Sequence, residues 1–194
     1  MTQSQGYILP PPDLPSGLKL LAVVAPYHKA ITDLLLQGAQ SVADQSGAHL
    51  ERIEVPSAQD IPAAIRFAAR MADFDGFIAL GCLVRGDTLS FDLIARESAS
   101  ALAMMGVEGL CIGNGILALE GIAQAEARAC PPQNDGGDTL SLTIDCNKGA
   151  AAAHSALHLI ALSRKWARQT KGIGFRPSGE SFRIAGEPEG ENRA

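Results

Sequence analysis

The sequence predicts an α/β protein with a four-stranded parallel sheet that has helices on both faces. The first observation is a series of short, uninterrupted apolar runs, such as KLLAVVA at 19–25, which are typical of strands buried on both faces. The second is that each run precedes a stretch with apolar residues at helical spacing, so strand–helix units alternate. A chain of 194 residues with 46% hydrophobic content is also large enough for one complete core.

These patterns place the individual elements in order along the chain. Strands are expected at residues 19–25, 49–55, 75–80 and 109–114, and helices at about 31–48, 60–72, 88–105, 119–129 and 148–171. Parallel neighbours require crossover connections, which are right-handed in nearly all proteins.

Three segments lie outside this alternation. Residues 1–17 contain four prolines and are expected to form an extended N-terminal arm. Residues 130–146 form a polar insert with Gly and Pro between two helices. Residues 172–194 combine five glycines with many charges and are expected to be a flexible C-terminal tail. The sequence therefore predicts one domain at residues 18–171.

The charge balance and the cysteines restrict the functional classes. The formal net charge is −5, with 21 acidic and 16 basic residues, so neither nucleic acid nor an anionic membrane is an expected partner. No apolar run approaches the roughly 18–20 residues of a membrane span, and residues 1–12 do not resemble a secretory signal. A cytoplasmic location is therefore expected. There Cys130 and Cys146 are expected as two free thiols, although oxidation could pair them.

Candidate ligand-binding residues follow the predicted strands. Open parallel sheets bind ligands at the carboxyl ends of their strands, which here precede residues 26–28, 56–60, 81–90 and 113–115. The polar groups, the glycines and the one aromatic residue in these segments suit a flat, polar ligand that carries a phosphate.

Each of these signals also has a purely structural interpretation. Gly86, Asp87 and Thr88 could bind an anion at a helix start or simply cap the helix, and Asp60 could likewise be a cap. Tyr27 could stack on a ligand or pack in the core. His154 and His158 have a spacing that can bind metal, but no third ligand is indicated nearby, so we expect a packed or solvated helix face and no metal site.

Five motifs in order carry a family resemblance. They are VPSAQDIP at 55–62, ALGCLVRGDT at 79–88, NGIL at 114–117, QAEARA at 124–129 and NKG at 147–149. Together they resemble the 6,7-dimethyl-8-ribityllumazine synthases of riboflavin biosynthesis, over about residues 19–171. The G-C-x-[VI]-R-G-[DE]-T block is the most specific of the five.

The resemblance implies a fold, an activity and an assembly. It implies a flavodoxin-like three-layer fold and a homo-oligomer built from pentamers, with active sites between neighbouring subunits. The implied reaction joins 5-amino-6-ribitylamino-uracil to 3,4-dihydroxy-2-butanone 4-phosphate, with loss of phosphate and water and without a metal or organic cofactor. Because the 130–146 insert lengthens a loop that is short in the family, a pentamer or decamer is expected rather than a closed capsid.

The resemblance also implies site residues. Tyr27 takes the position that stacks on the pyrimidine, while Ala58 and Asp60 hold the ribityl chain. Arg128 matches the arginine that a neighbouring subunit contributes to the phosphate, and Lys148 lies near the phosphate entrance. The full implied set is Ser57, Ala58, Gln59, Asp60, Leu83, Val84, Asn114, Lys148 and Tyr27 for substrate, with Gly86, Asp87, Thr88 and Arg128 for phosphate.

The main departure from the family pattern is Ser90, which stands where the family has a histidine. A histidine titrates near neutral pH and a serine does not, and a general acid–base is worth about 10²–10⁴-fold in rate. The sequence therefore predicts a slowed synthase, or alternatively a paralogue that binds a lumazine or flavin without turnover. His28 is a candidate substitute for the missing base, because it follows the neighbouring strand. Gln59 also departs from the pattern, in place of an aromatic residue.

Overall fold

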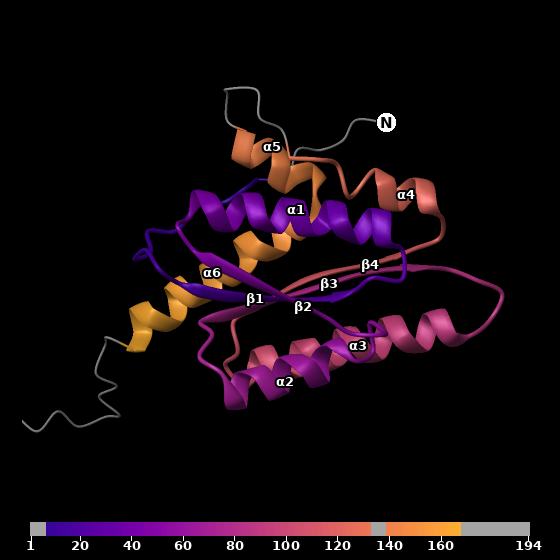
Figure 1. The fold of residues 1–194 in the computed structure, drawn as a ribbon, viewed down its shortest axis with the longest axis horizontal. Helices are drawn as coiled ribbons and strands as arrows, with labels where there is room; N and C mark the ends of the chain where they lie inside the picture. Colours follow the sequence, from indigo (N-terminus) through magenta and orange to yellow (C-terminus); the bar gives the residue numbers. More distant parts are fainter. Residues whose placement is uncertain (1–6, 133–138, 168–194) are drawn as a thin grey trace, which may run out of the picture.

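The fold is described from a computed structural model, for residues 7–132 and 139–167 (Figure 1). The strands are β1 (Lys19–Ala25), β2 (His49–Glu54), β3 (Gly76–Val84) and β4 (Ile112–Leu119). The helices are α1 (Lys29–Gln45), α2 (Ile61–Met71), α3 (Ser90–Val107), α4 (Ile122–Glu126), α5 (Thr139–Cys146) and α6 (Lys148–Ala167). All strand pairs are parallel and the strand order is β2-β1-β3-β4.

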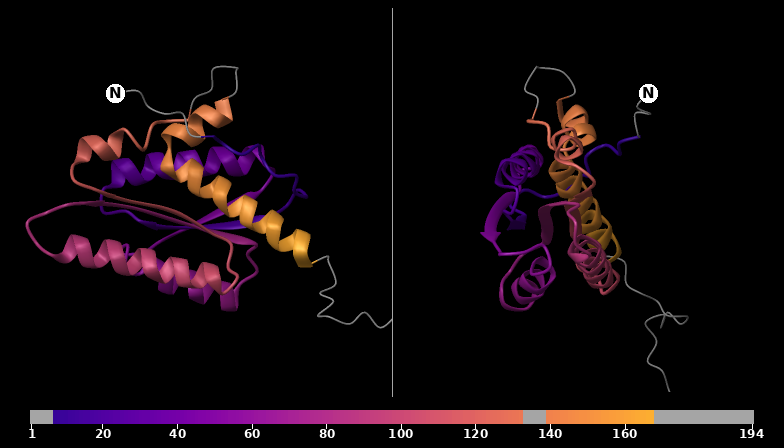
Figure 2. Two further views of the ribbon diagram at one scale, coloured as in Figure 1. Left: turned by 180° about the vertical axis from the view of Figure 1, so that it is seen from behind. Right: turned by 90° about the vertical axis from the view of Figure 1, so that its right-hand side faces the viewer.

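The sheet is the middle of three layers, as the sequence predicts. Helices α1 and α6 cover one face, together with α4 and α5, and α2 and α3 cover the other (Figures 1 and 2). Helices α1 and α3 carry the chain to an adjacent parallel strand, whereas α2 carries it from β2 past β1 to β3, so the chain winds in both directions from β1, which is the doubly wound arrangement. The predicted α/β class is confirmed.

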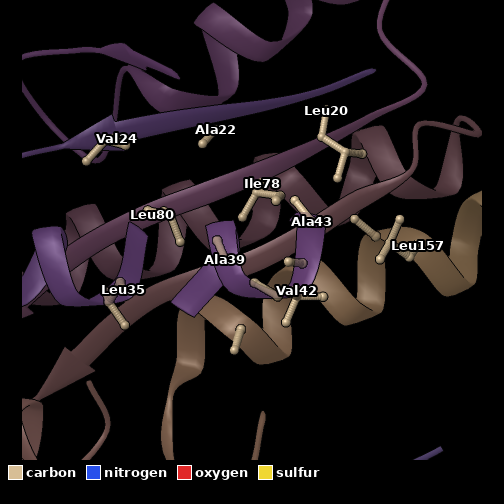
Figure 3. Packing of buried hydrophobic residues seen from close by; sticks show 14 of the residues in the cluster. Leu20, Ala22, Val24, Leu35, Ala39, Val42, Ala43, Ile78, Leu80 and Leu157 are labelled. Carbon is tan, nitrogen blue, oxygen red and sulfur yellow. The ribbon is translucent and has the colours of Figure 1, made fainter. Parts of the chain in front are cut away.

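The core has two parts because β1 and β3 are buried on both faces. Alternate residues of β1, namely Leu20, Ala22 and Val24, face α1 and α6, while Leu21, Val23 and Ala25 belong to the cluster under α2 and α3. Figure 3 shows the first cluster, in which side chains of α1 and α6 meet those of β1 and β3. The uninterrupted apolar run of β1 is thus explained by burial on two sides.

Small residues allow α6 to lie directly against the sheet and against α1. A Cβ atom added at Gly113 of β4 would overlap the backbone of Ala152, and one at Gly149 would overlap the backbone of Leu35. Most alanines of α6 are buried, and the backbone of this helix lies close to those of β4 and α1. This close approach is a constraint that hydrophobic periodicity alone does not express.

Two strands extend beyond their predicted ends. β3 continues to Val84 instead of ending at residue 80, because it remains paired with β4 up to Val84↔Leu119. The expected strand at 109–114 is displaced to Ile112–Leu119, so the segment 113–115 lies within a strand and not after it. The sequence analysis placed Gly113 and Gly115 in a candidate ligand-binding segment after the strand, whereas these glycines lie within β4 and make room for α6.

The insert at 130–146 contains a helix and a disulfide bond. Its second part forms α5, which contacts α1 and α6. Cys130 and Cys146 are joined with their Cα atoms 5.8 Å apart, so the expectation of two free thiols is wrong for this structure. The predicted tail at 172–194 lies outside the described residues. Within residues 7–132 and 139–167, every helix is too short or too polar to cross a membrane.

Candidate active site

Three loops meet at the carboxyl edge of the sheet. In the order β2, β1, β3, these strands lead into residues 55–60, 26–28 and 85–89. In Figure 1 this edge lies on the right, where α1 begins and where the loop from β3 to α3 turns back. Adjacent parallel strands end side by side, so the fold brings together segments that lie far apart in the sequence.

Tyr27 and His28 occupy the middle of this edge. Tyr27 is 82% exposed, which excludes the core-packing alternative. The two rings are in edge-to-face contact, with centroids 5.1 Å apart. The His28 carbonyl accepts hydrogen bonds from the amides of Ile31 and Thr32, which fixes the start of α1. An exposed phenol ring held by a defined turn is well placed for stacking.

The segment 57–60 forms a tight turn before α2. The amide of Ser57 donates to Asp60 Oδ2 at 3.0 Å, and the amide of Gln59 donates to Ser57 Oγ at 3.2 Å. The Asp60 carboxylate thus joins the two ends of the turn. It makes no side-chain hydrogen bond that caps α2, which was the structural alternative for this residue. Ala58 is buried, and Asp60 and Gln59 are exposed at the edge.

The loop after β3 holds the predicted phosphate residues. Leu83 and Val84 are the half-buried last residues of β3, and Gly86, Asp87 and Thr88 follow as exposed residues. α3 begins at Ser90 with Leu89 as its N-cap, so the expectation that Asp87 or Thr88 caps the helix is wrong. An apolar cap leaves the first backbone N–H groups of α3 available to an anion, and Ser90 is exposed at this helix start.

Arg128 and Lys148, which are 20 positions apart, meet through their backbones. The amide of Lys148 donates to the Arg128 carbonyl at 2.9 Å, and Ala129 and Asn147 form an antiparallel bridge. The Cys130–Cys146 disulfide joins the next pair of residues outward. The insert therefore begins and ends at paired backbone positions. Arg128 and Lys148, which lie just outside it, are both exposed.

Asn147 is a buried structural residue whose role the sequence motif did not indicate. It is fully buried, and its side-chain Nδ2 donates to the carbonyls of Leu34 and Cys130 at 2.9 and 2.7 Å. Its Oδ1 accepts from the amides of Gly149 and Ala150, which caps α6. Asn147 thus fixes α1, the 128–130 segment and α6 together, and with them the backbones that carry Arg128 and Lys148.

Asn114 lies away from this edge. It pairs with Ala79 in the middle of the sheet, five positions before the Val84↔Leu119 pair at the strand ends. Ala79 pairs in turn with Val23, two positions before the end of β1, so Asn114 is separated from β1 sideways by β3, at about 10 Å for two strand spacings of roughly 4.8 Å. Its exposed position on edge strand β4 allows it to face a second chain, and the structure does not bring it to Tyr27 or Asp60.

Arg85 was also missed, although it lies inside the most specific motif. Its guanidinium donates from Nε to both carboxylate oxygens of Glu120 and from its two terminal nitrogens to Asp92. It also lies over the Phe91 ring, 4.3 Å from the centroid. These partners are 35 and 7 positions away in the sequence, so only the fold shows the cluster.

The two histidines of α6 form a packed pair, as expected. His154 is 7% exposed, and its Nε2 lies 3.2 Å from Nε2 of His158. Burial, together with the neighbouring His158, lowers the pKa of His154. Over the part of the chain that the structure describes, no three His, Cys, Asp or Glu side chains are grouped so that they could hold a metal ion.

Fold and site together define a flavodoxin-like α/β protein with its candidate ligand-binding loops at the carboxyl edge of the sheet. Residues 17–164 match the sequence profile of the 6,7-dimethyl-8-ribityllumazine synthases. The chain therefore belongs to this family, whose members are transferases of riboflavin biosynthesis.

Individual relatives agree with the family match. The chain is 43% identical over 168 residues to the 6,7-dimethyl-8-ribityllumazine synthase of Jannaschia sp. (strain CCS1), covering 87% of this chain and 88% of the relative. It is 39% identical to the enzyme of Novosphingobium aromaticivorans, covering 76% of this chain and 98% of the relative. It is 42% identical to 6,7-dimethyl-8-ribityllumazine synthase 1 of Mesorhizobium japonicum, covering 75% and 85%.

Proposed function

We propose that this chain catalyses the condensation of 5-amino-6-ribitylamino-uracil with 3,4-dihydroxy-2-butanone 4-phosphate, in active sites shared between neighbouring subunits. The observation that carries the proposal is the alignment of three segments, 26–28, 57–60 and 86–88, at one edge of the sheet, where Tyr27, Asp60 and the 86–88 loop are exposed. These segments contain an aromatic ring, a carboxylate and a glycine-containing loop before a helix start, which match a pyrimidine, a polyol and a phosphate.

In the proposed site each segment has a separate task. The Tyr27 ring stacks on the pyrimidine, and the 57–60 turn holds the ribityl chain through the Ala58 backbone and the Asp60 carboxylate. The amides of the 86–88 loop and of the α3 start bind the phosphate of the second substrate. Holding the amine and the ketone in reacting geometry accounts for a large part of the acceleration, because it removes the entropic cost of a bimolecular encounter.

The second half of the site comes from a neighbouring subunit in this proposal. Arg128 grips the departing phosphate bidentately, Lys148 adds a second positive charge, and Asn114 faces the substrate. The position of Asn114 supports a shared site, since it is exposed on edge strand β4, with β3 between it and the end of β1 that precedes Tyr27. A pentamer or a decamer provides such repeated head-to-tail contacts.

Ser90 makes proton transfer the slow part of the proposed reaction. It lies at the start of α3 beside the phosphate loop, where a histidine could move protons between the condensing groups and a serine cannot near pH 7. His28 is the proposed substitute, because it contacts Tyr27 at the end of the adjacent strand. If His28→Ala leaves the rate and its pH profile unchanged, His28 has no such role.

The test is lumazine formation from the two substrates by the native chain and by Ser90→His. We expect turnover above the uncatalysed background in the native chain, and a rise of about 10²-fold or more in Ser90→His. Arg128→Met is expected to reduce turnover in both backgrounds. These outcomes support a synthase that works by positioning and by phosphate stabilisation.

Ser90 also favours a second candidate, a paralogue that binds a lumazine or flavin without turnover. For this candidate the native chain gives only background turnover, while Ser90→His restores the reaction. Direct titration with riboflavin and with 6,7-dimethyl-8-ribityllumazine then becomes the deciding measurement, because binding without turnover distinguishes the two functions.

A further inference from the structure

The side chain of Arg85 joins the two ends of the loop that follows β3. Arg85 precedes the loop of residues 86–89, and Asp92 follows it in the first turn of α3. The two terminal nitrogens of Arg85 donate to the two carboxylate oxygens of Asp92 at 2.8 and 2.9 Å. This bidentate pairing joins the two ends of the loop and sets the span that residues 86–89 must bridge.

A second carboxylate fixes the same guanidinium to the neighbouring strand. Arg85 Nε donates to Glu120, just after β4, at 2.8 and 3.0 Å, and the Arg85 amide donates to the Leu119 carbonyl at 2.9 Å. The guanidinium also lies over the Phe91 ring, with its central carbon 4.3 Å from the ring centroid. Side chain and backbone of Arg85 are thus held from three directions.

The two carboxylates also decide what Arg85 can bind. They stabilise its charged form and raise its pKa, and Arg85 in turn lowers the pKa of Asp92. One arginine between two carboxylates carries no excess positive charge, and its nitrogens already donate to protein oxygens. Backbone amides of the loop are therefore better placed to bind a phosphate than this guanidinium is.

We propose that Arg85 is a positioning residue that fixes the 86–89 loop in the conformation that binds the phosphate of the substrate. This inference rests on the proposed function of the site for its substrate, but the fixing of the loop is a property of the free protein. Arginine is required in this role because its planar fork reaches two carboxylates in fixed geometry, whereas the lysine ammonium acts as a single point charge.

The experiment compares four full-length proteins: native, Arg85→Met, Arg85→Lys and Arg52→Met. Arg52 is a matched control, because it is an exposed arginine paired with Glu54 on β2, away from the loop. The first measurement is amide hydrogen exchange of residues 93–96, the first hydrogen-bonded amides of α3 directly behind the loop, without substrate. We expect exchange to be about tenfold faster than in the native protein for Arg85→Met and nearly as fast for Arg85→Lys. Exchange in Arg52→Met should keep the native rate.

The second measurement separates positioning from direct binding through the kinetics of the same proteins. In Arg85→Met we expect the KM for the butanone phosphate to rise about tenfold while the KM for the pyrimidine stays native. Native exchange in Arg85→Met overturns the proposal, and a raised KM with native exchange does so as well, because it makes Arg85 a direct phosphate ligand. Full rescue by Arg85→Lys also contradicts it. If the native chain has no turnover, the proposed function fails while the exchange measurement still decides the role of Arg85.

Discussion

The two helical layers differ in how completely their apolar side chains are buried within one chain. The α1/α6 face is closed by small residues that bring backbones into contact, with Gly113 against Ala152 and Gly149 against Leu35. The α2/α3 face buries a smaller cluster and leaves large apolar side chains 61–91% exposed, whereas those that α4 and α6 expose are 40–58% exposed. The exposed side chains of α2 and α3 are Phe67, Met71, Leu93, Met104 and Val107.

This difference assigns different tasks to the two faces. The α1/α6 layer provides stability within one chain and fixes the backbones that carry Arg128 and Lys148 through Asn147. The outward apolar side chains of α2 and α3 are the kind of surface that another subunit covers. The first face is therefore expected to tolerate little change in shape, and the second to govern assembly.

The largest effect is expected where the α1/α6 face is tightest. A Cβ atom in Gly149→Ala overlaps the Leu35 backbone, so we expect a loss of about 3 kcal/mol or more in unfolding free energy. Gly106→Ala on α3 is the matched control, because its Cβ meets no atom of the described residues within 4 Å. That control should be stabilised by about 0.5–1 kcal/mol in chemical denaturation. Equal stabilities of the two variants contradict the tight contact.

The next effect concerns the α2/α3 face. Leu93→Lys combined with Met104→Lys places two charges on the exposed side of α3, and we expect association to weaken by about 3 kcal/mol with the fold retained. Sedimentation velocity measures the shift toward smaller species. Leu162→Lys on α6 is the control on the other face and should keep the native assembly. An unchanged sedimentation coefficient in the double variant places the interface elsewhere.

A smaller effect is expected at the base of the insert. Reduction of the Cys130–Cys146 bond should lower the unfolding free energy by about 2 kcal/mol, since it releases a 16-residue loop while the Asn147 hydrogen bonds remain. Denaturation with and without reductant measures this difference. The double variant Cys130→Ser, Cys146→Ser should show none. A native chain that is insensitive to reductant has no such bond in solution.

The smallest effect is a pH dependence of the α1/α6 face. Burial lowers the pKa of His154 below its usual 6.5, so the unfolded chain binds a proton that the folded chain resists. Stability is therefore complete above about pH 6.5 and declines as the pH falls below it. Denaturation at pH 8 and pH 5.5 should show this decline, and His154→Gln should reduce it. His49→Gln, an exposed control, should leave it unchanged. A decline that persists in His154→Gln assigns it to another group.

The sequence predicted the layers and the alternation of strands and helices better than the strand ends. The apolar run at 19–25 and the helical spacing after it are local signals, and both were confirmed in β1 and α1. The limits of β4 were wrong, because Gly113 and Gly115 serve a packing contact with α6 that only the folded chain contains.

The candidate site was only partly accessible from the sequence for a similar reason. Tyr27, Asp60 and the 86–88 loop follow strands, so topology alone places them at one edge. The partners of Arg85 and Asn147 lie up to 113 positions away in the sequence. Such contacts depend on helix docking and strand register, which no motif records.

The central claim, a site shared between two subunits, is tested most directly by mixing two inactive variants. One carries Tyr27→Ala and Asp60→Ala at the sheet edge, and the other carries Arg128→Met and Lys148→Met. Mixed oligomers of the two should regain about a quarter of native turnover, because some neighbours then combine two intact halves. No recovery in oligomers that contain both chains would mean that each active site lies within one subunit.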